Sequence, residues 1–334
     1  MRYMFVGVIF ILICIVLLSN PGISAPAKLA QTGFQFLSVG SDARAGAMAN
    51  TMTTLDIGSS ALFFNPAGMA RMETMVDISI SQNNWIDDIK YNSYSLGFRP
   101  FDGSFGVIGI ALTSVDYGEV QGTMVWENEQ GYIDTEIMRP TAFSMGMGYA
   151  KMLTDKFAVG GQVKYTGQQL GKSAVYAGVS NDSLTVTKNL AYATAYDFGT
   201  IYKTGWKSLA FGMSVRNFSK EIKFEEDQFE LPLTFRIGIS MDVIDLFDEH
   251  MDAHSLLVSI DALHPRSYPE QVNVGLEYTF MQLLSIRSGI FLDRDEENMT
   301  FGFGINKFGV FIDYAYTPFG VFNNVQRITL RFAL

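Results

Sequence analysis

The sequence is poor in charged residues, in cysteine and in long hydrophobic runs. Charged residues make up 17% of the 334 residues, against roughly 25% in soluble globular proteins. Lys and Arg number 24 and Asp and Glu number 34, so the net charge is −10. This acidic balance argues against a nucleic-acid partner, because such proteins carry a basic face. The apolar fraction of 48% also excludes an intrinsically disordered chain.

A single long apolar run, Tyr3–Leu18, follows Arg2 at the start of the chain. A helical membrane protein would need several runs of roughly 18 or more apolar residues. The run has the length of a signal peptide, and the small-x-small pattern of residues 25–27 predicts cleavage after Ala27. An uncleaved membrane anchor is the alternative, although the run is short for a span. The one cysteine, Cys14, falls inside the run, so disulfides and thiolate metal sites are excluded from the mature protein.

The rest of the chain alternates large apolar residues with small ones. In segment 143–150, Phe, Met, Met and Tyr alternate with Ser, Gly, Gly and Ala. The same period of two recurs in segments 209–216, 233–241, 272–280 and 299–306, and it is typical of β-strands. A soluble β-sandwich is the alternative, but its polar faces would be rich in Lys and Glu. Faces of Gly, Ser and Ala favour the lumen of a membrane barrel, with the large residues facing lipid.

The alternation predicts an all-β fold, a transmembrane antiparallel barrel of about fourteen strands that spans residues 76–334. The predicted strands are 76–82, 91–99, 104–115, 141–152, 157–167, 190–203, 209–218, 231–242, 254–263, 271–280, 283–291, 299–306, 308–317 and 325–334. Their even number suits a bacterial barrel. Long predicted outer loops (83–90, 116–140, 168–189, 219–230) alternate with short inner turns (100–103, 153–156, 204–208). Connection 243–253 is too long for this pattern, which indicates a short periplasmic helix or a strand count that fails there.

The predicted outer loops 116–140 and 219–230 carry a concentration of acidic residues, which we interpret as a solvated surface. Four further acidic residues, Asp293, Asp295, Glu296 and Glu297, offer oxygen ligands for a divalent cation. They lack EF-hand spacing, and we predict no metal site. The last strand alternates up to Leu334. Such a strand would close the barrel and resembles the signal that the outer-membrane barrel assembly machinery reads.

Residues 28–75 do not alternate, and we predict that they form a separate N-terminal hatch. Segment 43–55 is rich in small residues and compatible with a helix. Ser59 or Ser60 would cap a second short helix, Ala61–Phe64. The block Asn65-Pro66-Ala67-Gly68 would end that helix, because a residue before proline disfavours the α conformation. The lumen of the barrel is the place where this segment can pack.

Here the sequence resembles the PorV/PorQ family, a branch of the FadL-like outer-membrane barrels. The matching segments are 34–40 (FQFLSVG), 43–48 (ARAGAM), 61–68 (ALFFNPAG), 231–236 (LPLTFR), 261–265 (DALHP) and 274–278 (VGLEY). Where family members often place an acidic pair, this chain has Asp56-Ile57-Gly58.

The resemblance implies a fourteen-stranded barrel with its N-terminal segment folded into the lumen as a hatch. FadL-like proteins carry hydrophobic molecules across the outer membrane, with a shift of the hatch and lateral exit through an opening in the wall. PorV-like members act in type IX secretion and bind exported cargo proteins at the cell surface. Both functions stay open at this point.

Charged residues on the predicted inward faces are the candidate site residues. The cations are Lys164, Arg216, Arg236, Arg287, Arg327 and Arg331, and the carboxylates are Asp261, Glu277 and Asp313. A charge inside a barrel has to be solvated or paired. One interpretation is structural pairing with lumenal carboxylates and with hatch carbonyls. The other is that an unpaired arginine binds the carboxylate of an amphipathic ligand. We expect Arg44 and Asn65 to Gly68 to form the hatch motif and to fix the hatch.

Catalytic motifs are poorly represented, and we predict that the protein is not an enzyme and holds no cofactor. His254 is the one candidate for a Ser–His pair, and no Gly-x-Ser-x-Gly elbow accompanies it. His250 and His254 share the spacing of helical metal ligands but lack the His-Glu-x-x-His pattern. The prediction is an outer-membrane barrel in contact with lipid, which binds or translocates hydrophobic or amphipathic molecules, or else secreted proteins.

Overall fold

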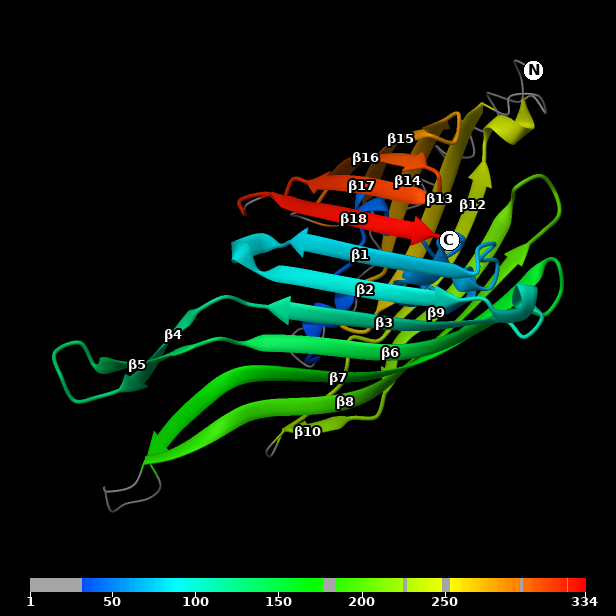
Figure 1. Cartoon of the computed structure of the whole chain (residues 1–334). Helices are drawn as coiled ribbons and strands as arrows, with labels where there is room; N and C mark the ends of the chain where they lie inside the picture. The colour runs from blue at the N-terminus through cyan, green and yellow to red at the C-terminus, as the bar shows by residue number, and fades with distance from the viewer. Residues whose placement is uncertain are drawn as a thin grey trace.

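The computed structural model describes residues 32–176, 184–224, 227–247, 253–292, 294, 297–322 and 324–334. Fourteen antiparallel strands form a closed barrel in which the first strand pairs with the last (Figure 1). The barrel strands are β1 Val76–Asn84, β2 Lys90–Phe98, β3 Val107–Asp116, β6 Thr141–Met152, β7 Phe157–Tyr176, β8 Leu184–Lys203, β9 Ala210–Ser219, β12 Thr234–Asp242, β13 His254–Pro265, β14 Gln271–Phe280, β15 Leu284–Phe291, β16 Met299–Lys307, β17 Val310–Thr317 and β18 Val325–Ala333.

The period-two alternation predicted the barrel correctly. Each predicted strand overlaps one barrel strand, and the predictions 141–152 and 271–280 match β6 and β14 to the residue. The largest differences are at β7 and β8. They continue to Tyr176 and begin at Leu184, where a loop over 168–189 was predicted. The predicted signal peptide, residues 1–27, lies outside the described residues.

The two faces of the wall differ as the alternation requires. On β6, Met145, Met147 and Tyr149 are exposed on the outside of the barrel, whereas Ser144 and Ala150 are buried on the inside. The large apolar residues therefore form the outer surface, and the small ones face the interior. A soluble sandwich would bury the opposite face, so that alternative is wrong.

One end of the barrel carries long hairpins. Strands β4 Val120–Val125 and β5 Tyr132–Met138 pair in a two-stranded sheet of their own, and so do β10 Ile222–Phe224 and β11 Asp227–Phe229. The β4–β5 hairpin and the ends of β7 and β8 extend beyond the rim (Figure 1). These hairpins lie within the long outer connections predicted over 116–140 and 219–230, in which no strands were predicted.

The other end carries short turns. A 3₁₀ helix, η5 Pro100–Gly103, joins β2 to β3, and η6 Ile244–Leu246 lies in the long connection after β12, where a short helix was one of the two expectations. A further 3₁₀ turn, η4 Ile86–Asp88, joins β1 to β2 at the hairpin end. The 3₁₀ helices named here are single turns. Among the described residues, no helix is both long and apolar enough to cross a membrane.

The segment before β1 folds inside the barrel as four short turns. They are η1 Gln35–Ser38, α2 Ala43–Ala47, η2 Gly58–Phe63 and η3 Pro66–Met69. We call this segment the hatch, and Figure 1 shows it in blue behind the front strands. The predicted helix over 43–55 stops at Ala47, because Ala49 and Asn50 adopt the left-handed conformation with φ of 49° and 59°. The predicted cap at Ser59 or Ser60 is wrong as well, because η2 begins at Gly58.

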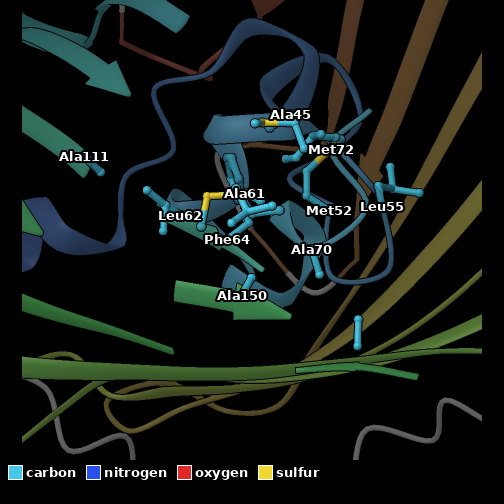
Figure 2. Packing of buried hydrophobic residues seen from close by; sticks show 14 of the residues in the cluster. Ala45, Met52, Leu55, Ala61, Leu62, Phe64, Ala70, Met72, Ala111 and Ala150 are labelled. Atoms are coloured by element: carbon cyan, nitrogen blue, oxygen red, sulfur yellow. The ribbon is translucent and has the colours of Figure 1, made fainter. Parts of the chain in front are cut away.

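Apolar hatch residues form the core of the molecule. Met48, Met52, Leu62, Phe64 and Met69 are almost completely buried and belong to one cluster. Figure 2 shows several of these hatch side chains together, with Ala111 of β3 and Ala150 of β6 on the facing wall. Full burial of such a side chain stabilises a fold by roughly 1.5–3 kcal/mol. The hatch therefore packs against the wall as a core packs in a soluble protein.

Candidate functional site

The interior of the barrel is the candidate site, and Asn65 fixes the hatch within it. The Asn65 Oδ1 accepts a hydrogen bond of 3.1 Å from the backbone N–H of Ala67 and so caps η3. Its side-chain amide donates to the carbonyl oxygens of Thr53 at 2.6 Å and Thr200 at 3.1 Å. Gly199 on β8 leaves the space that Asn65 occupies, since a Cβ there would collide with Oδ1. One side chain thus joins two hatch segments to the wall.

The other residues of the predicted motif, Pro66 to Gly68, lie at the same contact between η3 and the wall. Pro66 occupies the first position of η3. A backbone N–H at this position has no partner within the helix, so proline costs no hydrogen bond there. Ala67 packs against Gly160 of β7, and a Cβ on Gly68 would lie 2.5 Å from the carbonyl oxygen of Leu55. These residues therefore contact the hatch and the wall.

A buried carboxylate holds η2 against β1. Asp77 accepts hydrogen bonds from the backbone N–H of Ser59 at 2.8 Å and from its hydroxyl at 2.6 Å. The Arg331 Nε donates to the same carboxylate at 2.8 Å. The charge of Asp77 is therefore balanced in a site that solvent does not reach.

An ion-pair network connects α2 to β14, β15 and β17. Arg44 donates from Nε and Nη2 to the two carboxylate oxygens of Glu277, at 2.8 and 2.6 Å. Arg287 also pairs with Glu277, and its Nη1 donates to Asp313 at 2.6 Å. Burial alone would lower the pKa of Arg44, but Glu277 and then Asp313 raise it above its ordinary value. The guanidinium stays charged, and Arg44 is a bidentate anchor of the hatch.

A second charged cluster lies at an irregularity of the wall. The Lys164 Nζ lies 2.8 Å from Asp197 Oδ2 and donates to Asn217 Oδ1 at 2.6 Å. The pairing of β8 with β9 shifts beside Asp197, and Asn217 has a φ of 60°. The backbone N–H of Asn217 donates to Asp197 at 2.7 Å, which stabilises the bulge.

Three arginines bind hatch carbonyl oxygens. The pairs are Arg216 with Leu37 at 3.5 Å, Arg236 with Asn50 at 3.1 Å and Arg327 with Gly40 at 3.1 Å. Among the described residues, no carboxylate forms an ion pair with any of the three. The Nε atoms of Arg216 and Arg236 are buried and have no hydrogen-bond partner within the described chain. These arginines keep donor capacity that the protein itself does not use.

Two cavities flank the hatch. The cavity at the hairpin end, the outer cavity, has a volume of about 550 Å³. Its lining includes Arg216, Arg236, Arg294, Arg327, Trp85 and Phe319. The cavity at the short-turn end, the inner cavity, has a volume of about 880 Å³. Its lining includes Arg44, Glu277, Arg287, Asp313, Arg331 and His254.

The inward positions of the nine predicted charged residues all follow from the alternation, and the structure places each of them on the inner side. Arg44, Glu277, Arg287 and Asp313 come together, whereas Arg216 and Arg236 lie at the outer cavity. Sequence reasoning missed Asp77 and Asp197. The same alternation contains the signal for both, since each stands on the small-residue face of its strand.

The histidines and the acidic cluster lie partly outside the described residues. His254 Nδ1 lies 2.7 Å from the Tyr278 hydroxyl, and His250 lies outside the described residues. Three of the four clustered acidic residues, 293, 295 and 296, also lie outside them, and Glu297 pairs with Arg294. In the described part of the chain, no three His, Cys, Asp or Glu residues are placed to hold a metal ion.

The fold is similar to that of known outer-membrane barrels, although no sequence comparison found a relative. No protein-family model matches the sequence, and no curated protein matches it. The toluene transporter TbuX of Ralstonia pickettii is similar in structure, with a TM-score of 0.60 and 14% identity over 88% of this chain and 98% of that one. The toluene transporter TodX of Pseudomonas putida has a TM-score of 0.58 and 14% identity over 87% and 96%. A FadL homologue of Pseudomonas aeruginosa has a TM-score of 0.51 and 11% identity over 88% and 98%.

The fold is that of FadL-like outer-membrane barrels. At these identities the likeness concerns the fold alone, and the chain covers nearly the whole length of each neighbour. The arginines and carboxylates of this lumen have to be interpreted from their own chemistry.

Proposed function

We propose that the protein is an outer-membrane barrel without catalytic activity that binds and passes amphipathic molecules with an anionic group. The observation that carries this proposal is the outer cavity, where arginines with unused donors lie beside apolar rings. The apolar outer surface of the barrel supports contact with outer-membrane lipid. Insertion by the barrel assembly machinery belongs to the same proposal.

The outer cavity combines two kinds of surface. Arg216 and Arg236 supply guanidinium donors, and Leu263 lies with them in the lining. Trp85 and Phe319 pack edge to face with ring centroids 5.4 Å apart and supply an apolar wall. A carboxylate or sulfonate would accept hydrogen bonds from the free arginine nitrogens, while an alkyl or aromatic body would lie against the rings.

The structural neighbours support passage of apolar molecules through this fold. Two of them are described as toluene transporters. Toluene carries no charge, so the arginines of the present cavity indicate a ligand of different polarity. In this proposal the chain shares a transport function with these neighbours, and it differs from them in that its ligand carries a charged group.

Fluorescence titration of the purified barrel tests the proposal. The probe is 11-(dansylamino)undecanoate, and its methyl ester is the neutral control. Arg236→Met should weaken binding of the carboxylate by about 10- to 100-fold, the equivalent of losing a charged hydrogen bond of roughly 1.5–3 kcal/mol. Binding of the ester should not change. Arg139→Met is the matched control, because Arg139 pairs with Glu119 on the exposed hairpin.

Two results would contradict the proposal. Equal affinity for the acid and the ester would show that the arginines do not contribute to ligand binding. Failure of the unsubstituted barrel to bind either probe would show that the outer cavity is not a site for this class of ligand.

A PorV-like function in type IX secretion is the second candidate. The observation that favours it is the β4–β5 hairpin beyond the rim (Figure 1), which exposes Val125, Tyr132 and Ile137 among acidic residues. An isolated two-stranded sheet is only marginally stable in water, so a bound partner would stabilise it. Removal of residues 119–139 should abolish co-purification of exported proteins from the native membrane. Retention of those proteins by the shortened barrel would exclude this function for the hairpin.

A further inference from the structure

The outer cavity holds more positive than negative charge. Among the described residues that line it, four are arginines and one, Glu297, is a carboxylate. Glu297 pairs with Arg294, so the lining keeps an excess of positive charge after this pair has formed. A buried charge has to be paired or solvated. A ligand with a single anionic group would balance only part of this excess.

Three of the four arginines have an unused nitrogen at this cavity. The Nε atoms of Arg216, Arg236 and Arg294 are buried and have no hydrogen-bond partner within the described chain. A buried donor without an acceptor is costly, and most such donors in proteins are paired. These three nitrogens therefore mark the positions at which acceptors from outside the chain would bind.

Two of these arginines form one donor group, which we call the first anion site. On the adjacent strands β9 and β12, Arg216 pairs in register with Thr234, two residues from Arg236. The two arginines are therefore diagonal neighbours on the inner face, within reach of one shared anionic group. Asp261 does not line the cavity. Its carboxylate accepts hydrogen bonds from the backbone N–H and the hydroxyl of Thr53, at 3.3 and 2.6 Å.

The third arginine, Arg294, lies farther along the wall and forms the second anion site. In register across three strands, Arg236 pairs with Leu263, and Leu263 pairs with Gln271. Gln271 accepts a hydrogen bond of 3.1 Å from the Arg294 Nη2. The backbones of Arg236 and Gln271 are therefore two strand spacings apart, roughly 10 Å. The Arg294 guanidinium is held at this place by the Phe291 ring, whose centroid lies 4.4 Å away.

The wall between the two anion sites is apolar. Leu263 lines the cavity there and is buried. Its side chain offers no hydrogen bond to a polar group. A carboxylate or phosphate group is much shorter than two strand spacings, so a single anionic group cannot occupy both sites.

We propose that the ligand of the outer cavity carries an anionic group at each end of an apolar spacer, as an α,ω-dicarboxylate does. One carboxylate accepts hydrogen bonds from Arg216 and Arg236, the other accepts from the Arg294 Nε, and the spacer lies along Leu263. This inference rests on the proposed function and names the class of its ligand. The volume of about 550 Å³ is ordinary for a site of this kind.

Calorimetric titration of the purified barrel at neutral pH tests the inference without any variant. The ligands are decanedioate and its monomethyl ester, which share one spacer and differ by one charge. The unsubstituted barrel should bind decanedioate about ten-fold more tightly, because a second hydrogen bond between charged groups forms with the dianion alone. Each ligand should bind as one molecule per barrel.

Arg294→Gln isolates the second anion site. It should weaken binding of decanedioate about ten-fold and leave binding of the monomethyl ester unchanged. Unchanged binding of the ester also shows that the variant is folded. Arg236→Met should weaken binding of both ligands. Arg266→Gln is the matched control and should change neither, because Arg266 pairs with Glu230 at 2.7 Å and does not line the cavity.

Three results would overturn the inference and leave the proposed function intact. The first is equal affinity of the unsubstituted barrel for decanedioate and its monomethyl ester. The second is binding of two ester molecules per barrel, because the two anion sites would then take separate ligands. The third is an equal loss of affinity for both ligands in Arg294→Gln. Failure of both ligands to bind the unsubstituted barrel would instead refute the proposed function, and this inference with it.

Discussion

The two halves of the lumen hold the same hatch in different ways. Toward β1 to β8, η2 and η3 are buried in an apolar core with Phe64 and Leu62 at its centre. Toward β13 to β18, α2 and the turn after it lie between two cavities, and polar contacts hold them to the wall. These contacts are the ion pair of Arg44 with Glu277 and the hydrogen bonds that Asn273 and Thr300 donate to the carbonyl oxygens of Ala49 and Ala47. The apolar half of the hatch is therefore held as a protein core is, whereas the other half depends on polar contacts beside two cavities.

Removal of a core side chain should give the largest effect on stability. Phe64→Ala should lower the free energy of unfolding by about 3–5 kcal/mol, because it opens a cavity in the packed half. Phe303→Ala, on the exposed outer face of β16, should cost much less in a lipid bilayer. Denaturant titration of each variant in lipid vesicles, read by gel mobility without boiling, measures the difference. Equal losses for the two variants would contradict a core-like hatch.

Neutralising a member of the ion-pair network should have the second-largest effect on stability. Glu277→Gln should lower the free energy of unfolding by about 2–3 kcal/mol, because two arginines lose a charged partner. Glu119→Gln is the control, and its exposed pair with Arg139 should contribute less than about 1 kcal/mol. The same denaturant titration applies. A Glu277→Gln barrel as stable as the Glu119→Gln barrel would show that the network does not hold the hatch.

Paired glycine variants should separate stability from ligand binding. Gly160→Ala presses on η3 and Gly289→Ala presses on the turn after α2, since each added Cβ would meet hatch backbone. Both should destabilise the protein by roughly 1–3 kcal/mol. Only Gly289→Ala should weaken binding of 11-(dansylamino)undecanoate, because it displaces the turn at Asn50, which lines the outer cavity. Weaker binding with Gly160→Ala alone would reverse the assignment of the two halves.

Loss of the hatch cap should have the smallest effect of the four. Asn65→Ala removes a cap and three hydrogen bonds that the side-chain amide donates, at a cost of about 1–2 kcal/mol. Asn84→Ala, at the exposed end of β1, is the control. The difference in thermal midpoint between the two variants measures the cost. No difference would mean that Asn65 does not fix the hatch.

The sequence predicts the barrel well because the alternation of large and small residues is set within each strand, whatever the rest of the chain does. Residues one apart on a strand face opposite sides, so a wall between lipid and lumen imposes a period of two on every strand. The inward positions of Arg287, Glu277 and Asp313 follow from the same rule. Asp77 and Asp197 were missed although the same rule applies to them.

The hatch follows no such rule. Its helix ends because Ala49 and Asn50 take left-handed conformations, and these are fixed by contacts with distant strands such as the hydrogen bond from Arg236 to Asn50. The cavities cannot be predicted from a pattern either, because their volumes depend on how closely α2 approaches the wall. The missing alternation over residues 28–75 and the family resemblance both led to the prediction of a hatch, whereas its contacts required the structure.

Native mass spectrometry of the barrel extracted from its own membrane shows directly whether the lumen holds an anionic amphiphile. We expect a bound small molecule with an anionic group and an apolar body, which is lost from the Arg236→Met variant and kept by Arg139→Met. A barrel that carries no small molecule, or one whose bound molecule is neutral and unaffected by Arg236→Met, would contradict it.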